Sequence, residues 1–86
     1  MRLVLFENAA FEDLQFWSKN ELKLLKKIIE LIADIQKTPF TGIGKPEGLK
    51  HDFKGFWSRR INDEHRLVYK VTDTEIIIIS CRFHYN

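Results

Sequence analysis

The chain has 86 residues, of which 44% are hydrophobic and 13% aromatic, so it is long enough for one packed domain and its composition excludes wholesale disorder. Its 14 basic and 12 acidic residues give a net charge of only +2, which excludes a polybasic tail. A single cysteine excludes an internal disulfide, and no apolar run approaches the roughly 20 residues of a membrane span, so we expect one cytoplasmic domain over residues 1–86.

The first half of the chain is predicted to form a short strand and two helices. The apolar stretch Arg2–Phe6 is typical of a strand, and Asn8 and Asn20 can each cap a helix. Pro39 disfavours helical geometry at the residue before it, so the second helix should end there. We expect the apolar stripe of that helix to pack on the domain's own sheet rather than on a partner. The stripe consists of Leu22, Leu25, Ile28, Ile29, Ile32 and Ile35.

The second half is predicted to form a loop and then a sheet. Residues 40–48 hold three of the four glycines and one of the two prolines, which is typical of a loop. Short turns between the strand-like segments that follow force antiparallel neighbours. These segments are Phe56–Ile61, Arg66–Val71 and Glu75–Phe83, with a possible further strand at Leu49–Phe53. The fold class is therefore α+β, with the N-terminal strand and two helices packed on one face of a mainly antiparallel sheet of four to five strands.

Positive charge concentrates in residues 45–70, which carry seven basic and four acidic side chains. Because side chains alternate between the faces of a strand, Ser58 and Arg60 should lie on one side and Trp57, Arg59 and Ile61 on the other. We expect the last strand to bury the side that carries Ile77 and Ile79. If the strands are in suitable register, the exposed face forms an anion-binding platform. Its side chains would be Arg60, Arg66, Arg82 and His84.

Several side chains in this region have chemistry that suits a nucleic-acid backbone. Glu47 could accept a proton, Arg66 could donate two hydrogen bonds to one phosphate, and His84 could act as an acid or base near neutral pH. Aromatic residues beside basic ones can also stack single-stranded bases; these are Trp57, Phe83 and Tyr85. The same residue types also have ordinary structural roles, as a solvated carboxylate, a surface arginine, a terminal histidine without function and core aromatics. On composition and spacing alone, the functional and the structural interpretation both stay open. His51, His65 and Cys81 are assigned no function.

Longer motifs favour the functional interpretation. They read Gly-Lys-Pro-Glu at 44–47, Leu-Lys-His at 49–51, Gly-Phe-Trp-Ser-Arg-Arg-Ile at 55–61, Glu-His-Arg-Leu-Val-Tyr at 64–69 and Cys-Arg-Phe-His-Tyr at 81–85. In this order, and nearly without gaps, they closely resemble the Txe/YoeB toxins of bacterial toxin–antitoxin systems, which belong to the wider RelE-like superfamily.

The resemblance implies a ribonuclease that enters the ribosomal A site and cuts mRNA during translation. By motif, Glu47 matches the family's general base, Arg66 its phosphate-stabilising arginine and His84 its general acid. Tyr85 matches an aromatic residue that helps to place the nucleotide. The candidate RNA- or phosphate-binding residues are Lys50, Arg60, Arg59 and Arg82.

The resemblance also implies partners. These are a cognate antitoxin of the Phd/YefM type, the ribosome with its mRNA, and a second copy of the chain in a homodimer, with operator DNA contacted only through the antitoxin. We expect no metal, no cofactor and no membrane. Two alternatives are a non-catalytic inhibitor on the same scaffold, like the gyrase-poisoning ParE relatives, and a nucleic-acid-binding repressor module. The presence of Glu47, Arg66 and His84 argues against the inhibitor.

Overall fold

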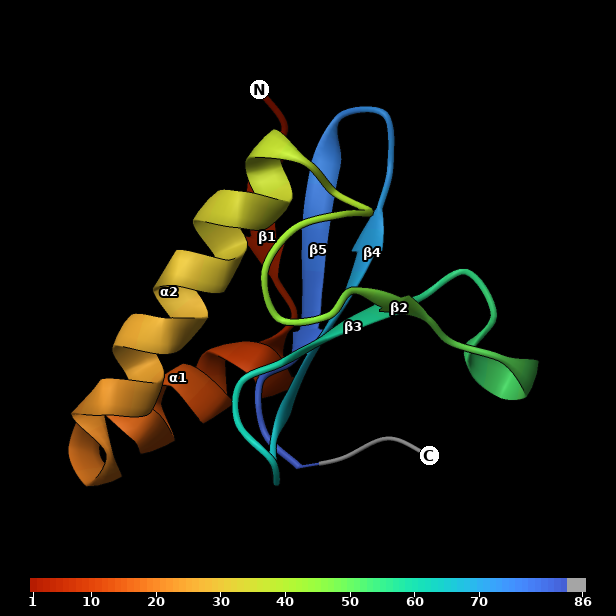
Figure 1. Ribbon diagram of the computed structural model, residues 1–86. Coiled ribbons are helices and arrows are strands. Elements are labelled where there is room, and N and C mark those ends of the chain that lie inside the picture. The colour runs from red at the N-terminus through yellow and green to blue at the C-terminus, as the bar shows by residue number, and fades with distance from the viewer. Residues whose placement is uncertain (84–86) are drawn as a thin grey trace.

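The structure, a computed structural model that describes residues 1–83, has a layer of two helices on one face of a five-stranded sheet (Figure 1). Strand β1 is parallel to β5, and the other neighbours are antiparallel in the order β1-β5-β4-β3-β2. This arrangement confirms the predicted α+β fold. The elements are β1 (Leu3–Phe6), α1 (Asn8–Asn20), α2 (Leu22–Lys37), β2 (Glu47–Gly48), a 3-10 turn η1 (His51–Phe53), β3 (Trp57–Arg60), β4 (Arg66–Val71) and β5 (Glu75–Ser80).

The buried face of α2 joins the helix layer to the sheet. Its buried residues are spaced three or four apart, which places them on one side of a helix. Leu22 and Ile29, which were predicted to belong to this stripe, are instead 55% and 58% exposed. The reason for Ile29 is that one step along a helix turns the side chain by about 100° away from Ile28. The apolar stripe of α2 packs on the domain's own sheet, as predicted. The shared core includes Ile28, Leu31, Ile32 and Ile35 of α2 with Leu67, Tyr69, Ile76 and Ile78 of the sheet.

The helix ends follow the predicted break but not the predicted caps. Thr38 closes α2 in an extended conformation with φ −140° and ψ 90°, as expected for a residue before proline. Asn8 lies inside α1, and Glu7 precedes the helix without a side-chain capping bond. The side-chain amide of Asn20 donates to the carbonyl of Phe16 at 2.8 Å. Asn20 thus completes the end of α1 and does not cap α2.

The short strand beside β3 lies earlier in the chain than predicted. The strand is Glu47–Gly48, whereas the later part of the predicted segment Leu49–Phe53 forms the turn η1 at His51–Phe53. His51 there has φ 58°, a left-handed conformation that interrupts extended backbone. The consequence for function is that Glu47 is held in the sheet by pairing with β3.

A β-bulge in β5 changes which of its side chains are buried. Val68 pairs with Ser80 while Tyr69 pairs with Ile78, so Ile79 is an extra residue. Ile76 and Ile78 are fully buried, whereas Ile77 and Ile79 are only partly buried, the reverse of the prediction. The strand also ends at Ser80 rather than at Phe83. A count of alternate positions that crosses a bulge assigns the wrong face.

Candidate active site

The face of the sheet turned away from the helices brings several candidate residues together. Leu67 and Tyr69 belong to the core under the helices, so Arg66 and Val68 of the same strand point to the opposite face. Val68 pairs with Ser58, and Ser58 pairs with Glu47. Residues directly opposite one another in an antiparallel pair project to the same side. Glu47 and Arg66 therefore share the face of the sheet that is turned away from the helices.

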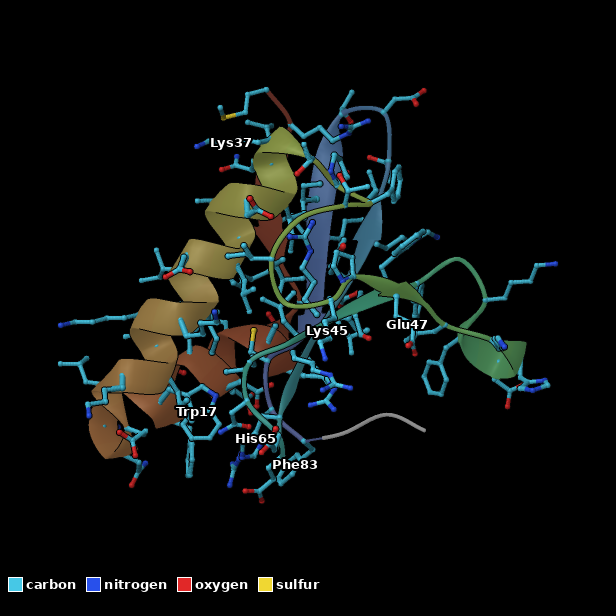
Figure 2. The ribbon with its side chains drawn as sticks, in the orientation of Figure 1. Trp17, Lys37, Lys45, Glu47, His65 and Phe83 are labelled. Carbon is cyan, nitrogen blue, oxygen red and sulfur yellow. The ribbon has the colours of Figure 1, made fainter. Side chains whose placement is uncertain are left out.

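Arg60 completes the group, because it lies directly opposite Arg66. Two like charges in this position repel, so a bound anion would stabilise the pair. Glu47 is the diagonal neighbour of Arg60 across β2 and β3, at a typical separation of about 7–8 Å. One carboxylate and two guanidinium groups are thus placed on the adjacent strands β2, β3 and β4. Figure 1 shows these strands side by side, and Figure 2 labels Glu47 on β2. The register that the sequence left open brings Arg60 and Arg66 into one patch.

The remaining contacts of these residues leave them available to a ligand. Nη1 of Arg66 donates to the carbonyl of Asn62 at 2.7 Å, which anchors the side chain at the start of β4. Glu47 and Arg60 have no side-chain hydrogen bond or ion pair within residues 1–83. Lys50 is exposed where the chain leaves β2. No three His, Cys, Asp or Glu side chains in this part of the chain are grouped to hold a metal ion.

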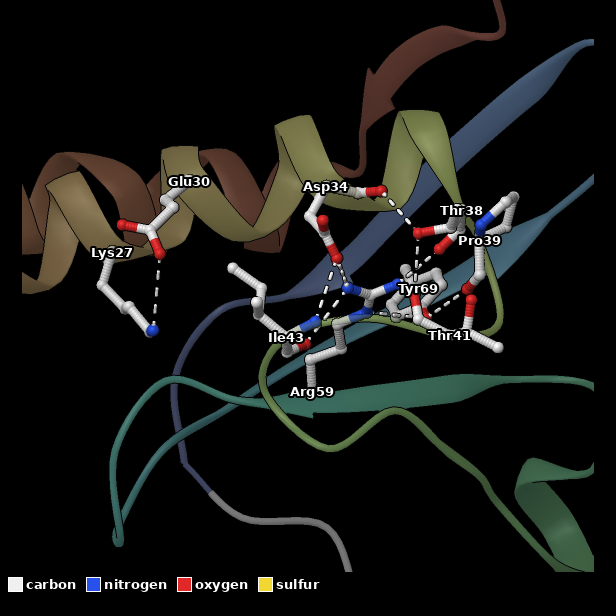
Figure 3. Close-up of polar contacts among 9 residues, drawn as sticks. All are labelled: Lys27, Glu30, Asp34, Thr38, Pro39, Thr41, Ile43, Arg59 and Tyr69. Atoms are coloured by element: carbon white, nitrogen blue, oxygen red, sulfur yellow. Dashed lines mark hydrogen bonds and ion pairs between the residues drawn. The ribbon is translucent and has the colours of Figure 1, made fainter.

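Arg59 has a different role from the RNA contact predicted for it. Its side chain is fully buried on the helix side of β3, and all five of its N–H donors meet protein acceptors (Figure 3). These acceptors leave no donor for phosphate, so the assignment of Arg59 to RNA binding is wrong. They are the carboxylate of Asp34, the hydroxyl of Tyr69, and the carbonyls of Thr38, Thr41 and Ile43.

Charge and burial hold this cluster in one protonation state. Hydrogen bonds from Arg59 and from the backbone N–H of Ile43 lower the pKa of the Asp34 carboxyl below its usual range. Burial raises the pKa of the Tyr69 hydroxyl, although Arg59 acts in the opposite direction. At neutral pH Asp34 is therefore ionised and Tyr69 keeps its proton. That proton is donated to the carbonyl of Pro39 at 2.6 Å.

Arg82 also lies elsewhere than predicted. Its guanidinium carbon is 3.5 Å from the ring centroid of Phe16 in α1, and its Nε is buried with no hydrogen-bond partner within residues 1–83. Arg82 is thus stacked against the helix layer and is not part of the patch formed by Arg60 and Arg66. Phe83, for which the sequence left both a core position and base stacking open, is 59% exposed. Trp57 is half-buried and packs against Phe40 at a centroid distance of 4.9 Å.

His65, to which the sequence assigned no function, holds the last described residues. Its Nδ1 accepts a hydrogen bond from the backbone N–H of Phe83 at 2.8 Å, and its ring meets the edge of Trp17 at 4.8 Å (Figure 2). Trp17 donates to the carbonyl of Cys81 at 2.9 Å, and Asp13 accepts the N–H of Cys81. No local sequence signal indicates this role, since the contact joins residues 18 positions apart. His84 and Tyr85, predicted to be catalytic, lie outside the described residues.

Comparison with known proteins decides the family. A family model described as YoeB-like toxin of bacterial type II toxin–antitoxin system matches residues 6–85. The chain belongs to this toxin family. Toxin YoeB of Escherichia coli K12 is 52% identical over 85 residues, which cover 99% of this chain and all of the relative.

Solved structures of YoeB proteins have the same fold. A YoeB dimer from Staphylococcus aureus aligns with a TM-score of 0.92 at 48% identity, over 98% of both chains. A heterotetrameric YoeB–YefM toxin–antitoxin complex from the same organism aligns with a TM-score of 0.89 at 49% identity, over 99% of this chain and all of the other. In the described part of this YoeB-like toxin, no helix has the length and apolar character needed to span a membrane.

Proposed function

We propose that this YoeB-like toxin is a ribosome-dependent endoribonuclease that cleaves mRNA in the ribosomal A site and thereby inhibits translation. The observation that carries the proposal is the placement of Glu47, Arg60 and Arg66 on one face across three adjacent strands. A proton acceptor next to two phosphate-binding cations is the combination that transesterification of RNA requires. Membership of the toxin family supports the same conclusion.

In the proposed reaction, Glu47 takes the proton of a ribose 2′-hydroxyl and the 2′-oxygen attacks the adjacent phosphorus. The new O2′–P bond forms as the P–O5′ bond breaks. Arg66 and Arg60, with Lys50 beside the sheet, stabilise the negative charge that develops on the phosphorane oxygens. His84 donates a proton to the leaving 5′-oxygen, and Tyr85 places the nucleotide. The products are a 2′,3′-cyclic phosphate and a free 5′-hydroxyl, and DNA is not a substrate because it lacks the 2′-hydroxyl.

The proposal includes the partners of the toxin. A YefM-type antitoxin would hold it inactive, as a YoeB–YefM complex exists for the relative from S. aureus. We also propose that two copies of the chain form a dimer, since the structure of a YoeB dimer from S. aureus has been solved. Contact with operator DNA would occur only through the antitoxin. Ribosome and mRNA are cytoplasmic targets, so we place the protein in the cytoplasm.

The experiment is primer extension on an mRNA undergoing translation in a purified system. Wild-type protein is compared with Glu47→Gln, Arg66→Ala and His84→Ala, each also tested on the same RNA without ribosomes. Glu30→Gln is the matched control, because it removes an equivalent carboxylate whose only ion pair among residues 1–83 is with Lys27, at 3.7 Å. We expect loss of the general base or acid to slow cleavage by about 10²–10⁴-fold.

Cuts within codons by wild-type and Glu30→Gln protein, made only with ribosomes and slowed in the three variants, would support the proposal. Cuts on free RNA as well would remove the ribosome dependence and keep the nuclease. If folded wild-type protein makes no cuts in either setting, the enzymatic function is wrong, and a non-catalytic inhibitor or a binding module takes its place.

A further inference from the structure

We propose that Arg59 is a positioning residue for Glu47, which it fixes by binding the loop that precedes the strand β2. This inference rests on the proposed function, since it assigns a role in placing the general base of that reaction. Arg59 touches neither Glu47 nor the face of the sheet that carries Glu47, so it acts through the loop backbone.

The guanidinium group of Arg59 is enclosed by the loop of residues 38–44. Nη2 donates to the carbonyls of Thr38 and Thr41 at 2.7 and 2.8 Å, and Nη1 donates to the carbonyl of Ile43 at 3.1 Å. Asp34 in α2 binds both Nη1 and the backbone N–H of Ile43. A planar guanidinium can serve acceptors on several sides at fixed angles, which a lysine ammonium cannot do. The side chain therefore determines the path of the loop at three of its carbonyls (Figure 3).

Tyr69 adds a second connection between the same groups. Its hydroxyl accepts from Nε of Arg59 at 3.2 Å and donates to the carbonyl of Pro39 at 2.6 Å. The first residues of the loop are thus joined to β4 as well as to β3. Within residues 38–44, hydrogen bonds from Arg59 and Tyr69 reach four carbonyl groups.

The end of the loop is tied to the residues on either side of Arg59. The backbone N–H of Arg60 donates to the carbonyl of Gly44 at 2.7 Å, and Ser58 pairs with Glu47. Three consecutive residues of β3 therefore hold the loop and the strand that carries the carboxylate. The side chain of Arg59 points to the helices, while Ser58 and Arg60 face the proposed site. A displacement of the loop is transmitted to Glu47 over only three residues.

Such a displacement would matter because a general base must lie within hydrogen-bond reach of the proton it takes. Misplacement of a reacting group by about 1 Å can lower the rate by about 10²-fold. The loop contains Gly42 and Gly44, both at positive φ, so its backbone gains much conformational freedom when its anchors are removed. Arg59 opposes this freedom without contacting the substrate.

The test compares wild-type protein with Arg59→Lys, which keeps the charge beside Asp34 but not the fork of donors. A milder variant, Tyr69→Phe, removes only the hydroxyl between Arg59 and Pro39. Ile76→Val in β5 is the stability control, chosen because Ile76 is buried and pairs with Val4 and Val71, away from the loop. Single-turnover cleavage of ribosome-bound mRNA and affinity for the ribosome complex are measured separately. We expect Arg59→Lys to cleave about 10–100-fold more slowly with affinity unchanged.

A double-mutant cycle separates positioning from a general structural role. If Arg59 acts through Glu47, Arg59→Lys should slow cleavage in the wild-type background but change the rate by less than about threefold in the Glu47→Gln background. Equal slowing in both backgrounds would overturn the inference. It would also be overturned if Arg59→Lys and Ile76→Val had the same melting temperature and cleaved at the same rate. If Arg59→Lys does not fold, Tyr69→Phe decides in the same cycle. Absence of cleavage by the wild-type protein instead refutes the proposed function.

Discussion

The Nδ1 atom of His65 accepts the backbone N–H of Phe83 at 2.8 Å, which requires a neutral imidazole with its proton on Nε2. That Nε2 lies 3.6 Å from the carboxylate of Glu64. A protonated imidazole has two donors and no acceptor, so it cannot make this contact with Phe83. The N–H of Arg66 donates to the carbonyl of Phe83 at 2.9 Å. The residue that precedes His84 is thus held on both sides by the start of β4.

We expect His65→Asn to preserve this contact and His65→Leu to abolish it. An asparagine carbonyl lies near the position of Nδ1, whereas leucine keeps much of the volume but has no acceptor. Loss of the acceptor should loosen residues 81–83 and expose Cys81, whose thiol is buried and has a pKa raised to about 12 by that burial. Alkylation of Cys81 at pH 8 should therefore be faster in His65→Leu, and cleavage slower, than in His65→Asn.

Equal alkylation rates in the two variants would show that His65 does not hold the segment. A cleavage rate close to wild type in His65→Asn but not in His65→Gln would support the assignment to Nδ1. The glutamine amide reaches one atom further and would miss this position. Melting temperatures of the variants serve as the control for general destabilisation.

Local patterns predicted the parts of this molecule that depend on nearby residues. Pro39 indicated the end of α2, and alternation in β3 placed Arg59 and Arg60 on opposite sides. The resemblance supplied Glu47 and Arg66, and the sheet register then brought them to one face. What the sequence could not predict depends on tertiary contacts, such as the bond between Arg59 and Asp34, 25 residues apart. The bulge at Ile79 likewise has no local signal, and it changed the face assigned to β5.

Arg60 and Arg82 should differ in their contribution to RNA binding. Arg60 is exposed opposite Arg66, so Arg60→Ala should reduce the slope of log affinity against log salt by about 0.7, the value for one phosphate contact on a single strand. Arg82 is stacked on Phe16, so Arg82→Ala should leave that slope unchanged and lower stability by about 0.5–2 kcal/mol. Filter binding across a salt series and urea unfolding measure the two effects. A lower slope for Arg82→Ala would place this side chain on the RNA after all.

Asp34 should make the stability of the protein depend on pH in the acid range. Hydrogen bonds from Arg59 and Ile43 lower the pKa of Asp34 in the folded state, so its contribution is fully present above the unfolded pKa of about 3.9 and is lost as the pH falls through the folded value. Asp34→Asn should therefore be less stable than wild type at pH 7, with a smaller difference at pH 3. Urea unfolding at both pH values measures this, with Glu30→Gln as the exposed control. A difference that is the same at pH 7 and pH 3 would contradict the charge-based contribution.

Gly44 and Gly55 allow the contacts of the loop to be separated from backbone strain. Both have positive φ, at 79° and 95°, so alanine at either position should cost about 1–2 kcal/mol in strain. A Cβ at Gly44 would also lie 2.8 Å from Cδ2 of Leu31 and 3.2 Å from Cβ of Arg59, whereas a Cβ at Gly55 would meet nothing within 4 Å. Gly44→Ala should therefore be the more destabilising by about 1–3 kcal/mol in urea unfolding, because the packed loop must shift.

The single-turnover cleavage rate gives a second comparison between Gly44→Ala and Gly55→Ala. A shift of the loop at Gly44 is transmitted toward Glu47, three residues later, while Gly55 lies beyond the strand β2. Gly44→Ala should thus lose single-turnover rate beyond what its stability explains, and Gly55→Ala should not. Equal losses of stability for the two variants would mean that the loop moves freely away from Arg59 to accept the extra atom. In that case the loop is not held tightly enough for Arg59 to set the position of the carboxylate.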